Sequence, residues 1–181
     1  MIYGDRIRLR APERDDLPRF VSWLNDPEVR AGLWMVLPMS MAEEENWFEE
    51  VLKRPPETHP MTIEIEETDG WIPIGNLGIF EIHKTAHNAE MGIMIGNKAY
   101  WNKGFGTKAI KLLLKHCFNT LNLHRVFLRV FANNPRAIRC YEKVGFVHEG
   151  RMREAVFQGG AYHDMLIMGV LRDEWKTDEE E

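Results

Sequence analysis

The stretch between residues 88 and 144 constrains the fold most, because it contains two strand patterns that alternate with two helix patterns. A β-rich run at about 89–95 is followed by a helix after Gly106, a second β-rich run at 125–132, and a helix at 135–144. Strands joined through a helix in one sheet run parallel, with a right-handed crossover. We therefore expect the strands near residues 90 and 128 to be parallel neighbours in one sheet.

The flanking segments add strands and helices. Alternating apolar residues predict strands at 5–11, 61–67 and 71–82, and a final hairpin of strands at 146–157 and 161–171. Helical spacing predicts a helix capped by Asp15 or Asp16, a short helix at about 28–34, and a helix at about 41–53. The sequence therefore predicts an α/β (α+β) fold with a mixed sheet. We assign residues 1–175 to one domain and 176–181 to an acidic tail.

Composition narrows the functional classes. The chain has a net charge of -5, which argues against nucleic acid as the main partner, because neutralising phosphates requires clustered Lys and Arg. No apolar run approaches the ~20 residues of a membrane span, and the start of the chain does not have the pattern of a secretory signal. Only two cysteines are present, which favours a reducing compartment and hence the cytoplasm.

A glycine-containing loop joins the strand that ends at Ile93, Met94 and Ile95 to the following helix. The first N–H groups of a helix lack internal partners and carry partial positive charge. Gly104 and Gly106 would let a phosphate group come close to them. Two glycines before a helix also occur in ordinary turns, so this loop alone is a weak signal. Its spacing fits neither a P-loop nor the dinucleotide fingerprint.

The helix at 135–144 presents a second pattern. The plain interpretation is that Asn134 caps this helix and Tyr141 belongs to the core. However, Asn134, Ala137 or Ile138, and Tyr141 share one helix face. An amide, a small or apolar residue and a phenol in a row would suit a thin, partly polar ligand that ends at the phenol.

Taken together, the two segments resemble the two signature motifs of the GNAT superfamily of N-acetyltransferases. The run Trp101-Asn102-Lys103-Gly104-Phe105-Gly106 resembles the acyl-CoA loop Gln/Arg-x-x-Gly-x-Gly/Ala, with Trp101 where many members have Gln or Arg. The pattern Asn134-x-x-Ala137-x-x-x-Tyr141-x-x-x-Gly145-Phe146 resembles the second motif. Both ends of the chain are similar to the branches that acetylate ribosomal-protein N-termini and spermidine.

This resemblance implies a mostly antiparallel sheet with a central splayed pair of parallel strands and helices on both faces. It also implies acetyl-CoA as co-substrate and no metal. Ile93, Met94 and Ile95 would pair with the pantetheine arm, and Asn134 would hydrogen-bond it, beside Ala137. The pyrophosphate would be held by the loop residues Trp101, Asn102, Lys103, Gly104, Phe105, Gly106 and Thr107. Tyr141 would protonate the departing thiolate.

The sequence says less about the base and the acceptor amine than about acetyl-CoA binding. Glu90 is the candidate base, acting through water, although it also suits a solvent-facing or salt-bridged position. No cysteine stands out as an acyl carrier, which favours direct transfer in a ternary complex. The acceptor is expected to be a primary amine, with a peptide or protein N-terminus slightly favoured over a polyamine. A non-catalytic acyl-CoA-binding or sensory module is the alternative, and a homodimer is left open.

Two groups near residue 40 also have two interpretations. Trp34, Met35, Met39 and Met41 would either line an acceptor pocket or fill the core. The glutamates at 43–45 would either attract a polyamine or form the solvated face of a helix. The sequence favours the core for the first group and the solvated helix face for the glutamates.

Overall fold

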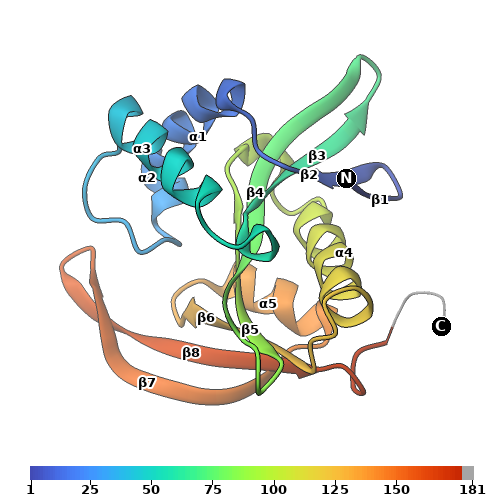
Figure 1. Ribbon diagram of the computed structural model, residues 1–181. Helices are drawn as coiled ribbons and strands as arrows, with labels where there is room; N and C mark the ends of the chain where they lie inside the picture. Colours follow the sequence, from blue (N-terminus) through green and yellow to red (C-terminus); the bar gives the residue numbers. More distant parts are fainter. Residues whose placement is uncertain (177–181) are drawn as a thin grey trace.

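The computed structural model describes residues 1–176, and its centre is a mixed sheet of eight strands (Figure 1). The strand order is β1-β2-β3-β4-β5-β6-β8-β7, and only β5 and β6 run parallel. This confirms the expected mixed, mostly antiparallel sheet. The strands are β1 (Ile2–Gly4), β2 (Ile7–Arg10), β3 (Met61–Glu67), β4 (Gly70–His83), β5 (Asn88–Ile95), β6 (Arg125–Phe131), β7 (Val147–Gln158) and β8 (Ala161–Leu171).

Helices cover both faces of this sheet (Figure 1). The helices are α1 (Leu17–Leu24), α2 (Pro27–Arg30), α3 (Met41–Leu52), α4 (Phe105–Asn119) and α5 (Pro135–Val144). The apolar faces of α4 and α5 pack with the strands in the main core, whereas α1 and α3 share a smaller cluster around Phe20 and Phe48. Within the described residues, no helix has the length and apolar character to cross a membrane.

A short strand precedes the first predicted one. The strand predicted at 5–11 is β2, and the structure adds β1, which pairs antiparallel with β2. Arg6 lies in the turn between them with a φ of 56°, a left-handed conformation that allows a tight reversal. The three residues of β1 are too few to show alternation, so only β2 left a pattern in the sequence.

The sequence predicted that Asp15 or Asp16 caps α1. The Asp16 side chain makes no capping hydrogen bond to α1. Instead, its carboxylate accepts hydrogen bonds from the Glu13 N–H at 2.9 Å and from the Arg10 guanidinium at 2.6 and 2.8 Å. Glu64 on β3 accepts a bond from Arg10 at 2.8 Å and another from Arg8 at 2.6 Å. This buried charge network joins β2 and β3 to the start of α1.

The network predicts acid sensitivity. Burial alone would raise the pKa of Asp16, but hydrogen bonds from Arg10 and the Glu13 N–H outweigh it and lower that pKa. Its stabilising effect is therefore present above the unfolded-state pKa and is lost as the pH falls through the folded-state pKa. We expect Asp16→Asn to reduce the free energy of unfolding at pH 7 by about 2 kcal/mol, measured by urea denaturation.

The control for this prediction is Asp15→Asn, because Asp15 is the exposed neighbour of Asp16. The control should unfold like the wild type. The difference between Asp16→Asn and the wild type should shrink below about pH 4, where carboxylates become protonated. A difference of the same size at pH 3 and pH 7 would show that the lost charge is not the cause.

The two parallel strands separate soon after they meet. β5 pairs with β6 only from Asn88↔Arg125 to Glu90↔Phe127, although both strands continue beyond these residues. On its other edge, β5 stays paired with β4 as far as Gly75↔Ile95. The edge of β5 that faces β6 is therefore left without a strand partner at residues 91–95, which is the expected splay.

Candidate active site

A cavity of about 850 Å³ lies where β5 and β6 separate. Its lining comes from β5, the end of β6, the start of α4, one face of α5, and the α1–α3 region. Clefts of this size hold small molecules and cofactors in many proteins. The structure brings these predicted site residues to its wall: Glu90, Ile93, Met94, Ile95, Trp101, Asn102, Gly104, Phe105, Gly106, Thr107, Asn134, Ala137 and Tyr141.

Lys103 is the predicted site residue that the structure places elsewhere. Its ammonium group lies 5.3 Å from the centre of the Tyr100 ring, outside the lining of the cavity. Because the loop would act through backbone N–H groups, this side chain is not needed for a phosphate site of that kind.

The loop before α4 is shaped by residues with left-handed backbone conformations. Asn102 has a φ of 59°, and Gly104, directly before the helix, has a φ of 84°. A Cβ at Gly104 would meet nothing within 4 Å, so glycine is favoured there by conformation rather than by space. The turn opens α4, whose first N–H groups point away from the helix body and suit an anion.

Trp101 organises the loop and holds a cation beside it. Its indole Nε1 donates a hydrogen bond to the Ile95 carbonyl at 2.7 Å, which ties the loop to the end of β5. The Arg136 guanidinium stacks on the indole, with its carbon 3.5 Å from the ring centre. Trp101 thereby positions an arginine from α5, a residue that no sequence pattern singled out.

Asn134 both caps α5 and lies at the cavity wall, so its two predicted roles are compatible. Its side-chain oxygen accepts the Ala137 N–H at 3.2 Å and so caps α5. The same residue lines the cavity. Because the oxygen is used by the cap, the side-chain amide nitrogen remains as the group that can donate to a ligand.

Tyr141 lies at the inner wall of the cavity. Its side chain is 8% exposed and packs edge-on against Phe146, with ring centres 5.9 Å apart. Burial, with a smaller contribution from Cys140, raises the pKa of this phenol well above its usual value. The hydroxyl therefore keeps its proton at neutral pH, as a proton donor must.

Glu90 is engaged in an ion pair. Its two carboxylate oxygens accept hydrogen bonds from Arg129 Nε at 2.8 Å and Nη2 at 3.0 Å. This is the salt-bridged position that the sequence offered as the alternative to a base. The pair places the Arg129 cation directly against both oxygens of the Glu90 carboxylate.

Cys140, the residue before Tyr141, also lines the cavity. Its sulfur lies 3.3 Å from Thr107 Oγ1, a contact between α5 and α4. Burial raises the pKa of the Cys140 thiol, which disfavours the reactive thiolate.

The remaining part of the cavity is mainly apolar. Trp34, Met35 and Met39 line it together with Trp47, so these residues belong to a pocket rather than only to the core. Met41 is the exception and is 37% exposed. One of the glutamates at 43–45 also lies in this part: Glu44 is buried at the cavity wall, not on the solvated face that the sequence favoured. Within the described part of the chain, no cluster of His, Cys, Asp and Glu is arranged to hold a metal.

Comparison with known proteins agrees with this geometry. The family model of the acetyltransferase (GNAT) domain matches residues 6–147. A spermidine N(1)-acetyltransferase from Vibrio cholerae is 31% identical over 172 residues, covering 95% of this chain and 96% of the relative. A putative ribosomal N-acetyltransferase, YdaF from Bacillus subtilis, is 24% identical over 178 residues, covering 96% of this chain and 95% of that protein.

Solved structures show the same likeness. The crystal structure of spermidine N-acetyltransferase from Vibrio cholerae in complex with CoA and spermine has a TM-score of 0.84 and 30% sequence identity to this chain. The match covers 94% of this chain and 98% of that one. Sequence motifs, fold and comparisons agree that this chain belongs to the GNAT family of N-acetyltransferases, which use acetyl-CoA as co-substrate.

Proposed function

We propose that this enzyme transfers the acetyl group of acetyl-CoA directly to a primary amine, and that the α-amine of a peptide or protein N-terminus is the favoured acceptor. One observation carries the proposal. A single continuous cavity joins the free edge of β5, the start of α4 and Tyr141 to a largely apolar pocket under α1–α3.

The residues at one end of this cavity fit a CoA thioester. The unpaired backbone of residues 91–95 can bind the pantetheine arm as an added strand would bind. The N–H groups at the start of α4 can hold the pyrophosphate, with Arg136 beside them. Asn134 can donate to the arm through its amide nitrogen.

The reaction then needs only groups at the cavity wall. The neutral amine nitrogen attacks the thioester carbonyl carbon, and a free N–H of β5 stabilises the oxyanion. When the tetrahedral intermediate collapses, the carbon–sulfur bond breaks and the Tyr141 hydroxyl donates its proton to the thiolate. The lost amine proton leaves through water, which also returns a proton to Tyr141, because Glu90 is held by Arg129. Cys140, whose thiol stays protonated, supports direct transfer over an acyl-enzyme.

The charges in the pocket support a single amine over a polyamine. In the described residues, the cavity is lined by two carboxylates, Glu44 and Glu90, and Glu90 already pairs with Arg129. The other lining charges are cationic: Arg136, Arg139 and Lys143. A polyamine carries several ammonium groups and would need several free carboxylates. The names of the spermidine-acetylating relatives nevertheless make a polyamine the second candidate.

A substrate panel separates these acceptors. Thiol release from acetyl-CoA is measured with short peptides that begin with an apolar residue, with spermidine, and without an amine. We expect the peptides to give the highest kcat/KM. A higher value for spermidine would identify the polyamine as acceptor. CoA binding without turnover on any amine would favour the non-catalytic module.

Arg136 gives a separate prediction for CoA binding. Arg136→Gln keeps a planar polar group but removes the charge that stacks on Trp101 beside the start of α4. We expect the Kd for CoA to rise about tenfold, which corresponds to the loss of one charge-assisted hydrogen bond. Calorimetry with CoA measures this. The control is Arg54→Gln, since Arg54 is exposed and lies outside the cavity lining; equal Kd values for the two variants would contradict the assignment.

The two cysteines indicate in which cellular compartment the enzyme works. Cys117 is buried and Cys140 is half-buried, and both are free. Free thiols are usual where glutathione and thioredoxin keep cysteines reduced. We therefore propose a cytoplasmic enzyme.

A further inference from the structure

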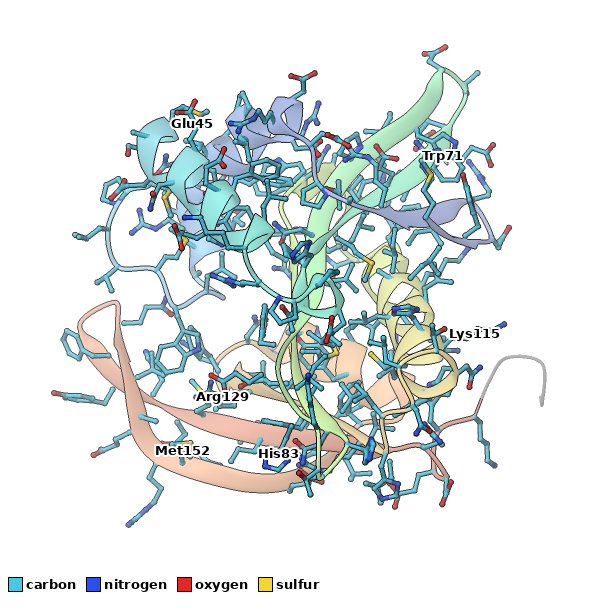
Figure 2. All side chains as sticks on the ribbon, viewed as in Figure 1. Glu45, Trp71, His83, Lys115, Arg129 and Met152 are labelled. Atoms are coloured by element: carbon cyan, nitrogen blue, oxygen red, sulfur yellow. The ribbon has the colours of Figure 1, made fainter. Side chains whose placement is uncertain are left out.

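The first turn of α3 contains three consecutive glutamates that do three different things. Glu43 forms a capping box with Ser40: the Ser40 N–H donates to its carboxylate at 2.8 Å, and Ser40 Oγ accepts the Glu43 N–H at 3.2 Å. Glu45 is exposed on the outer side of the helix (Figure 2). Glu44 is only 3% exposed. The solvated face that the sequence predicted therefore excludes Glu44.

Helix geometry explains why Glu44 points inward. Residues four and seven positions later, Phe48 and Val51, lie on the same helix face and are buried in the fold. The cap at Ser40 fixes where α3 begins and hence its rotation, so the burial of Glu44 follows from the local sequence. Its side chain reaches the cavity wall beside Met39 and Trp47.

Glu44 has no partner for its charge. Within residues 1–176, the structure shows no hydrogen bond or ion pair to its carboxylate, and burial alone raises its pKa to about 7. Asp16 and Arg19 at the start of α1, the helix packed against α3, pair with each other. Arg14 forms an ion pair with Glu49 on α3 itself. Removing a carboxylate from water without a partner destabilises a fold, so nothing in the folding of this chain accounts for Glu44.

We propose that Glu44 binds the ammonium group of the incoming acceptor, which gives up one proton to water before it attacks, and so selects cationic amines with apolar substituents. This inference rests on the proposed function. Trp34, Met39 and Trp47 supply the apolar walls, and the Glu44 carboxylate supplies the charge that an ammonium group requires. Of the two carboxylates that line the cavity in the described residues, Glu44 is the one that is not paired.

The first test measures binding without turnover. The CoA-loaded enzyme is titrated by calorimetry at pH 8 with n-pentylamine, which is then an ammonium ion, and with the neutral 1-pentanol. We expect Glu44→Gln to weaken pentylamine binding about tenfold or more, as expected for a lost charge-assisted hydrogen bond, and to leave pentanol and CoA binding unchanged. The matched control is Glu45→Gln, which should bind like the wild type.

The second test asks whether Glu44 is merely structural. A carboxyl with a raised pKa loses stabilisation as the pH rises from its unfolded value towards the folded one. Glu44→Gln should therefore melt at or above the wild-type temperature at pH 8, with a smaller gain at pH 5. A variant that melts lower at pH 8 would show a structural role and would contradict the inference.

The outcomes separate this inference from the proposed function. Equal pentylamine binding by Glu44→Gln and wild type, or a wild type that does not prefer pentylamine to pentanol, would overturn the role of Glu44. If pentylamine binding depends on Glu44 but no peptide is acetylated, the peptide acceptor is wrong and the role of Glu44 stands. If peptides are acetylated equally by both proteins, the proposed function stands and the role of Glu44 is wrong.

Discussion

Tyr141→Phe is expected to lower kcat by about 10²–10⁴-fold, the usual contribution of a positioned acid, and to leave the Kd for CoA unchanged. Phenylalanine keeps the ring and its edge-on contact with Phe146, so the fold should not change. What is lost is the hydroxyl, which burial keeps protonated by raising its pKa. Without it, the thiolate must leave unprotonated or take a proton from water.

The measurement is single-turnover thiol release at saturating acetyl-CoA and amine, so that chemistry and not product release is observed. Tyr162→Phe is the matched control, because Tyr162 lies exposed on the β7–β8 hairpin. Retention of the wild-type single-turnover rate by Tyr141→Phe would show that another group, or water, supplies the proton.

Gly75→Ala is expected to cause the largest loss of stability among single methyl additions in the sheet. A Cβ at Gly75 would lie 2.0 Å from the Met94 carbonyl oxygen and 2.9 Å from the Ile95 Cα. Both are backbone atoms, so no side chain can move to make room. Relief requires β4 and β5 to separate at the point where β5 borders the cavity. We expect a loss of about 3 kcal/mol in the free energy of unfolding, and weaker CoA binding.

Gly150→Ala is the control for this prediction. Gly150 also lies in a strand, but its Cβ would meet the Ile167 side chain at 3.6 Å, which is ordinary van der Waals contact. Urea denaturation gives the free energies, and calorimetry gives the Kd for CoA. Similar stabilities for the two variants would mean that β4 and β5 can move apart at Gly75 at little cost in free energy, which would contradict the prediction.

The sequence predicted those features that local patterns encode. The parallel pair β5–β6 follows from the helix that joins its strands, and the loop at Gly104 and the cap at Asn134 are signals within a few residues. Contacts between distant residues left no such pattern. Glu90 and Arg129 are 39 residues apart, and Arg136 meets Trp101 only after α5 packs beside the loop.

Glu44 shows the same limit in another form. In the sequence it is the middle residue of three glutamates, and such a run usually lies in solvent. Only the cap that sets the rotation of α3, and the packing of α3 against α1, decide which glutamate turns inward. The sequence does show a capping box at Ser40, which fixes where α3 begins. Counting helix positions from that start is the one signal that could have placed Glu44 on the inner face.

The splayed edge of β5, the start of α4 and Tyr141 are expected to hold acetyl-CoA together, and a crystal structure of this enzyme with bound CoA tests this. We expect the pantetheine arm along residues 91–95, the pyrophosphate at the first N–H groups of α4, and the sulfur within roughly 3–4 Å of the Tyr141 hydroxyl. A CoA molecule bound elsewhere, or a sulfur far from that hydroxyl, would contradict it.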